Sequence, residues 1–274
     1  LELRINAMNS LSKIIGLDNV ADNLIDLAIQ NSPKAKDQAF KNLVNYTGHL
    51  EQRVSLLEME LPIVKNNSLS EAFSNPANMK FLGKCLNEAC LTSDDDRHSI
   101  LASLLLERLN SNENDMVALV GSAACEVVNS LTEVHFRILA TALILHRKII
   151  PKYEGKATKE IFSEHIDDIF RKYEKLLSKE IIVMDIDFGH LWALSCLMHL
   201  GMRRKLYEVY YSSLHLDGWG HKDATPSKHE WWNNLELIWS RGLTYSILSA
   251  TGTLIGIFYL DHLFDEKSEI HWSR

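Results

Sequence analysis

The stretch AKDQAFKNLVNYTGHLEQRVSLLEMEL, residues 35–61, decides the fold class. Its apolar side chains recur at alternating spacings of three and four residues, which is typical of a long amphipathic helix, and Thr47 is the one polar residue in the series. Such a helix is about 40 Å long and needs a partner for its apolar stripe. The partner is either a second copy of the chain or another helix of the same chain. The pattern predicts an oligomer seam formed by Phe40, Leu43, Leu50, Val54, Leu57 and Leu61.

The composition extends this helical prediction to the rest of the chain. Of the 274 residues 46% are apolar, and the 12 glycines and 5 prolines are too few for a turn-rich β-sandwich. We therefore expect a mainly α protein, a helical bundle with a long N-terminal helix, whose C-terminal part can include a small winged-helix-like fold. Breaks in the pattern predict N-terminal helices in 1–66, a helical bundle in 67–152 and a mainly helical domain in 153–274.

Helix-start signals place the helices of the predicted bundle. Ser93 is followed by three aspartates, which suit the free amides and the positive dipole end of a helix N-terminus. Further helices are expected after Asn114 and after Thr132, and the three should form a compact bundle. In the C-terminal domain the pattern predicts a β-like run at 181–184 and helices at 187–200 and 230–239.

The uncharged segment Gly242–Leu260 has two interpretations. Gly252 and Gly256 have the small-x-x-x-small spacing of membrane helix pairs, so a membrane span is one interpretation. Several Ser and Thr residues dilute its hydrophobicity, and we favour an extended stretch at 243–248 followed by a helix capped by Ser249.

The order of elements in this segment resembles the end of a winged helix-turn-helix domain. There, a strand that contains Tyr and ends in the motif Leu-Ser/Thr-x-x-Gly leads into a closing helix. The matching residues here are Tyr245, Leu248, Ser249 and Gly252. The resemblance implies a DNA-binding regulator as one possible function.

Charge distribution argues against a protein whose whole surface binds nucleic acid. The formal net charge is -7 and the pI is about 5.9. Residues 1–130 hold 11 Lys/Arg and 17 Asp/Glu, whereas residues 131–274 hold 18 and 19. Within the nearly neutral C-terminal half, the basic triplet Arg203, Arg204 and Lys205 is the candidate nucleic-acid-binding site.

Candidate metal and catalytic sites are few. His215, Asp217, His221 and His229 gather metal-type donors in one polar loop, but without a spacing such as H-E-x-x-H. We expect no bound metal there and no cofactor. The common phosphate-loop, dinucleotide and hydrolase-elbow motifs are absent from the sequence.

The cysteines predict core packing in a reducing compartment. None of them has a C-x-x-C spacing, and the chain is too long to need disulfides for its stability. A cytoplasmic protein is therefore expected, and the start of the chain at Leu1 suggests a processed or partial chain. The four residues concerned are Cys85, Cys90, Cys125 and Cys196.

The order of short motifs in residues 75–145 resembles that in a group of uncharacterised bacterial proteins related to the abortive-infection Abi-alpha type. The motifs are Asn75-Pro76, the acidic cap at 94–96, the leucine-rich run 104–109, Ala123-Ala124-Cys125 and the stretch 131–139. The resemblance implies a cytoplasmic bacterial protein linked to phage or stress defence. It implies no catalytic residues.

Together these features predict a non-enzymatic interaction or regulatory module. Its expected partner is a protein or a second copy of the chain, and a membrane partner is not expected. A winged-helix DNA-binding regulator is the alternative, and a metal-dependent enzyme using the loop 215–229 is the third hypothesis.

Overall fold

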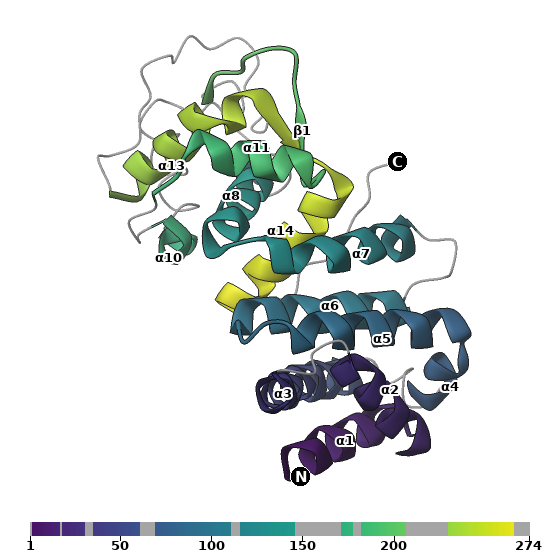
Figure 1. Ribbon diagram of the computed structural model, residues 1–274. Helices are drawn as coiled ribbons and strands as arrows, with labels where there is room; N and C mark the ends of the chain where they lie inside the picture. The colour runs from purple at the N-terminus through teal and green to yellow at the C-terminus, as the bar shows by residue number, and fades with distance from the viewer. Residues whose placement is uncertain are drawn as a thin grey trace. The chain divides into compact units, whose positions relative to one another are not determined.

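The computed structural model describes residues 2–16, 18–30, 35–60, 69–110, 116–145, 171–177, 182–206 and 230–265. Within these ranges the protein is mainly α-helical, as predicted, with one pair of short strands (Figure 1). The chain divides into two compact units. Unit 1 comprises Leu1–Ser130 with Phe264–Arg274, and unit 2 comprises Leu131–Leu263.

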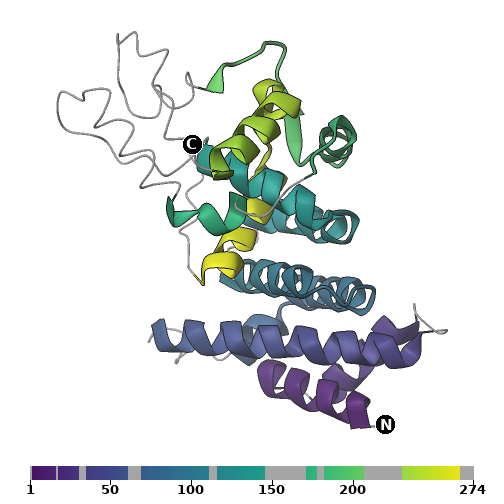
Figure 2. The ribbon, with the colours of Figure 1, turned by 90° about the vertical axis from the view of Figure 1, so that its left-hand side faces the viewer.

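Unit 1 is built from helices that pack around α3. Figure 2 shows α3 running between α1 on one side and the pair α5 and α6 on the other, and α3 contacts all three. The described elements of this unit are α1 (Glu2–Ile15), α2 (Asp18–Gln30), α3 (Lys36–Glu60), α4 (Leu69–Ser74), α5 (Pro76–Cys90), α6 (Asp95–Asn110), α7 (Met116–Val127) and the 3-10 helix η1 (Val128–Ser130).

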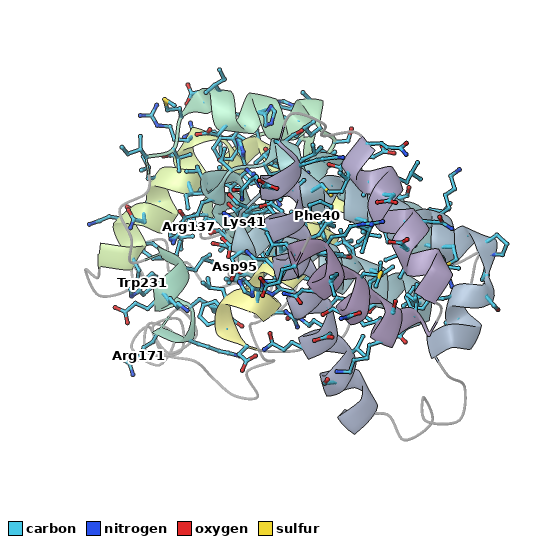
Figure 3. All side chains as sticks on the ribbon, turned by 60° about the horizontal axis from the view of Figure 1, so that its bottom comes forward. Phe40, Lys41, Asp95, Arg137, Arg171 and Trp231 are labelled. Carbon is cyan, nitrogen blue, oxygen red and sulfur yellow. The ribbon has the colours of Figure 1, made fainter. Side chains whose placement is uncertain are left out.

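The apolar stripe of α3 has its partners within the chain. Leu43 and Leu50 are fully buried and Val54 is nearly so, while Phe40, labelled with Lys41 in Figure 3, is half-buried. Because Leu43, Leu50 and Val54 are packed inside a single chain, the internal alternative accounts for the heptad pattern at these three positions. The side chain of Leu57 and the residue Leu61 lie outside the described residues.

Helix starts in unit 1 follow the polar residues of the sequence. Asn75 accepts a hydrogen bond from the amide of Ala77 and caps α5, with Pro76 in the first turn. The α6 cap is Asp94, whose carboxylate accepts the Arg97 amide at 3.0 Å, so the cap lies one residue after the predicted Ser93.

Unit 2 contains helices and the two-stranded sheet. β1 pairs antiparallel with β2, with Leu197 opposite Leu248 and His199 opposite Ser246. The described elements are α8 (Glu133–Leu143), α10 (Glu174–Leu177), α11 (Asp185–Ala193), β1 (Leu197–His199), α13 (Glu230–Arg241), the 3-10 helix η3 (Leu243–Tyr245), β2 (Ser246–Leu248) and α14 (Ala250–Phe264).

The strands differ from the predicted ones. The helix expected at 187–200 ends at Ala193, and Ser195 adopts a positive φ of 55° that turns the chain into β1. Residues 182–184 of the expected β-like run are not a strand. Local periodicity predicts a helix through 197–199 because it cannot show that these residues pair with a segment about fifty residues later.

The segment 242–260 forms two elements, as favoured. After η3 and β2, the Ser249 hydroxyl accepts the Gly252 amide at 3.0 Å and caps α14, which buries Leu254 and Ile255. Gly252 and Gly256 face backbone of the same unit, at Cys196 and Leu139, so their spacing serves close packing inside unit 2. In the part of the chain that the structure describes, no helix is long and apolar enough to cross a membrane.

The division of the chain also differs from the expected one. α3 packs with α5 and α6 in one unit, although the predicted boundary at residue 66 separates them. α8 belongs to unit 2, so the three helices after residue 93 do not form one bundle. Among described residues, β2 pairs with the distant β1 and with no neighbouring strand, so the hairpin of a wing is not formed there.

Candidate functional site

The basic triplet is held in place by a backbone ladder that continues beyond β1. The Arg204 amide donates to the Thr244 carbonyl at 2.9 Å, and the Thr244 hydroxyl donates to the Arg204 carbonyl at 2.7 Å. The antiparallel pairing of β1 extends to Leu200, whose amide donates to Tyr245, and after a bend at 201–202 the chain returns to Thr244. This pairing places Arg203 and Lys205, both exposed, on either side of an anchored residue.

Arg204 itself has a structural role. Its guanidinium donates to the backbone carbonyls of Leu243 and Ser246 and lies 5.6 Å from the ring centre of Trp239. Burial lowers the pKa of Arg204 from its ordinary value. The Nη2 group of Arg204 is thus engaged with backbone of unit 2, so Arg203 and Lys205 are the members of the predicted nucleic-acid-binding triplet that are exposed.

A pocket of about 550 Å³ opens beside the triplet. We call it the basic pocket, and its lining residues are Arg203, Arg204, Lys205, Leu206, Trp239 and Thr244. A second pocket of about 460 Å³, the α13 groove, is lined by Leu206, Asn233, Glu236, Leu237, Trp239 and Ser240. Since Leu206 and Trp239 line both, the two pockets adjoin. The cations of the triplet line the basic pocket, and Glu236 lines the α13 groove.

Apolar and aromatic side chains are exposed close to the triplet in the sequence. Met198 on β1 is 47% exposed and Met202 is 69% exposed. The rings of His199 and Tyr245 stack in parallel with their centres 6.0 Å apart, and Trp192 meets His199 edge-on. Methionine and aromatic side chains beside arginine are a composition enriched in protein interfaces.

The exposed face of α13 is not that of a DNA recognition helix. Its buried face carries Trp231, labelled in Figure 3, and Trp232. Its solvent side carries Asn233 and Glu236, and its C-terminal Arg241 pairs with Asp185 at 3.4 Å. A carboxylate in the middle of this face would repel the phosphates that flank a major groove.

His135 and Asp187 form a second polar cluster in unit 2. The Nδ1 atom of His135 accepts the Thr132 amide at 3.0 Å, and its Nε2 atom lies 3.4 Å from Asp187. Asp187 in turn accepts the Met184 amide at 2.7 Å at the start of α11. Burial lowers the pKa of His135. Since both side chains cap helix starts, the cluster stabilises the ends of α8 and α11.

The cysteines are all free and buried, which confirms the predicted core packing. The sulfur atoms of Cys85 and Cys125 are 3.8 Å apart. Burial raises the pKa of Cys85 well above its ordinary value and raises the pKa of Cys90 and of Cys196 to about 12. Because the thiolate is the nucleophile and metal ligand, these thiols are poorly suited to either role.

His215, Asp217, His221 and His229 lie outside the described residues. Across the described ranges, no group of three or more His, Cys, Asp or Glu side chains is arranged to hold a metal ion.

One family model matches residues 12–225 of the chain, and that family has no known function. The chain belongs to this family. The matched region includes the helices of unit 1 from within α1 onward, and it includes β1 with the basic triplet. No curated protein and no solved structure is significantly similar to the chain.

The contribution of α13 to the two pockets could not be predicted from the sequence. Trp239 and Glu236 come more than thirty residues after the triplet, and the helix predicted at 187–200 would have hidden Met198. The available signal was the cluster of tryptophans in the helix predicted at 230–239, which does not show what they pack against.

Proposed function

We propose that this protein is a non-enzymatic interaction module that recognises a protein partner through unit 2. The observation that carries the proposal is the exposure of Met198 and Met202 next to Arg203 and Lys205. Large apolar side chains that are exposed on a folded unit commonly mark protein interaction sites. The exposed cations add a preference for partners with acidic surfaces.

Charge supports a protein partner over a nucleic acid. The N-terminal half is net acidic, the C-terminal half is nearly neutral, and the Arg204 guanidinium is occupied by backbone carbonyls. Binding to nucleic acid without sequence preference requires many phosphate contacts from lysine and arginine. The triplet offers too few such contacts to dominate the surface.

Nucleic-acid binding is the second candidate. The favouring observation is the exposed stack of His199 on Tyr245, since aromatic side chains near cations can stack nucleobases. For the interaction module, the resemblance to the Abi-alpha type supports a setting in bacterial phage or stress defence.

The test is affinity purification of the tagged full chain from its native host after nuclease treatment. We expect a specific protein to be retained by the wild type and lost with Met202→Glu, because a carboxylate would enter an apolar contact. The matched control is Leu119→Glu, which replaces a residue that is 68% exposed on α7. Retention of nucleic acid alone, or equal retention by both variants, would contradict the proposal.

A further inference from the structure

The basic pocket and the α13 groove form one concave surface, because Leu206 and Trp239 line both. We propose that this surface binds a short extended segment of the partner protein. The segment places an acidic side chain against Arg203, an apolar side chain over the shared floor, and a basic side chain against Glu236. The inference rests on the proposed function and specifies what the partner presents.

The opposite charges at the two ends favour this occupant. Arg203 and Glu236 are both exposed; Arg203 lines only the basic pocket, and Glu236 lines only the α13 groove. A nucleic-acid strand carries a negative charge at every phosphate, so the end that attracts it at Arg203 would be followed by repulsion at Glu236. A peptide can carry one charge of each sign and match both ends.

The floor between the two ends is apolar and firmly built. Leu206 and Leu237 are half-buried, and Trp239 is 6% exposed, with the Arg204 guanidinium 5.6 Å from its ring centre. A buried aromatic residue at the centre of a concave surface is typical of an interaction hot spot. An apolar side chain of the segment would gain contact here without displacing any hydrogen bond of Arg204.

The form of the surface also favours an extended segment. Both pockets are open to the surface, with volumes of about 550 and 460 Å³. Sites for small molecules usually enclose most of the ligand. An open groove with charged and apolar lining residues suits instead an extended peptide, whose successive side chains can contact different parts of it.

The experiment is a selection of random twelve-residue peptides, displayed on phage, against the immobilised full chain. We expect the wild type to enrich peptides with an acidic and a basic residue on opposite sides of a large apolar residue. Arg203→Glu should lose the acidic preference only, and Glu236→Lys should lose the basic preference only. Lys80→Glu, a change of an exposed residue on α5, is the matched control and should select the same peptides as the wild type.

Affinity measurement makes the result quantitative. For the most enriched peptide, fluorescence anisotropy should give a dissociation constant at least about tenfold weaker for Arg203→Glu than for the wild type. Replacing the acidic residue of the peptide by Ala should weaken wild-type binding and have little further effect on Arg203→Glu, because the two groups interact with each other. Intrinsic tryptophan fluorescence shows whether each variant is folded, and Arg203→Gln is a milder second variant.

The outcomes separate this inference from the proposed function. Peptides that bind Arg203→Glu and Glu236→Lys as well as the wild type, but fail to bind Met202→Glu, would overturn the groove and leave a protein-binding function standing. No enrichment above a blank surface would overturn the inference. If, in addition, a labelled DNA duplex or single strand bound at low salt and Arg203→Glu abolished that binding, the proposed function would fail as well.

Discussion

A single added methyl group at Gly252 should destabilise unit 2. A Cβ atom at this position would lie 2.0 Å from the carbonyl oxygen of Cys196 and 3.2 Å from a methyl carbon of Leu139, whereas ordinary contacts begin at 3.4 Å. Either α14 or the backbone at Cys196 must therefore move by more than about 1 Å. The same carbonyl accepts hydrogen bonds from the amide and the hydroxyl of Ser249, at 3.1 and 3.0 Å. The movement would disturb the cap of α14 as well.

The expected size of the effect follows from two opposing contributions. Overpacking of a close contact costs about 1–3 kcal/mol and sometimes more. Alanine in a helix recovers up to about 1 kcal/mol relative to glycine. A 2.0 Å contact with backbone is at the upper end of this range, about 3 kcal/mol, so for Gly252→Ala we expect a net loss of about 2 kcal/mol in the free energy of unfolding.

Urea denaturation followed by tryptophan fluorescence is the suitable assay. All six tryptophans lie between residues 192 and 272, so the signal reports on the C-terminal half of the chain. With a urea dependence of about 2 kcal/mol per molar, the midpoint should fall by about 1 M. Gly189→Ala on α11 is the control, since a Cβ there meets nothing within 4 Å, and it should be neutral or stabilising. Equal midpoints for the two variants would refute the close approach of α14 to Cys196.

Other regions of the molecule give further predictions. Leu50→Glu should lower the free energy of unfolding by about 4 kcal/mol, since this residue is fully buried in unit 1. If the variant stays as stable as the wild type and light scattering shows only the loss of an oligomer, the internal packing would be contradicted. Arg204→Met should cost about 2 kcal/mol because two backbone carbonyls lose a charged donor, whereas the exposed Lys205→Met should leave the urea midpoint nearly unchanged; equal effects would argue against an anchoring role. Burial lowers the folded-state pKa of His98 and His135, so as the pH falls the unfolded chain takes up protons before the folded chain does. The free energy of unfolding should therefore be highest above a pH of about 6.5 and decrease as the pH falls from there through the folded-state pKa values. Urea midpoints that do not change between pH 7 and pH 5 would contradict this linkage.

Helix positions were predictable where periodicity and capping agree. The stretch 35–61 predicted α3 to within a residue at each end, and Thr132 and Ser249 precede α8 and α14 as expected. In each case the deciding interactions are local, between residues one to four positions apart. Local patterns also predicted that the four cysteines are core residues, and all four are buried, although Cys196 lies in a bend after α11 and not in a helix.

Non-local features were not predictable in the same way. The heptad pattern of α3 is the same whether its partner is α1, α6 or a second chain, because periodicity records only that one face is buried. The pairing of β1 with β2 joins residues about fifty positions apart, and three residues are too few to show an alternating pattern. The helix expected at 187–200 therefore ran on through Ser195, where the chain in fact turns.

The candidate site combines both kinds of information. The triplet was recognisable as a cluster of cations, but its residues have different roles once the backbone ladder is formed. Arg204 turns toward the carbonyls of Leu243 and Ser246, while Arg203 and Lys205 stay exposed. Adjacent residues of an extended segment point to opposite sides, so a run of three like charges cannot act as one stripe here.

The site consequently depends on strand register as much as on the residues that it exposes. Leu197 and Leu248 face each other across the sheet and are both buried. A slip by one residue would turn every side chain of β1 to the other face and expose Leu197, at a cost of about 1.5–3 kcal/mol for each leucine removed from the core. Beyond the sheet Leu200 bonds to Tyr245 in the same register, and after a bend at 201–202 the Arg204 amide bonds to Thr244, five residues after Trp239. Core packing at one end of the ladder thereby holds Arg203 at the edge of the pocket, so a substitution that disturbs the strand pair should weaken partner binding without touching the partner.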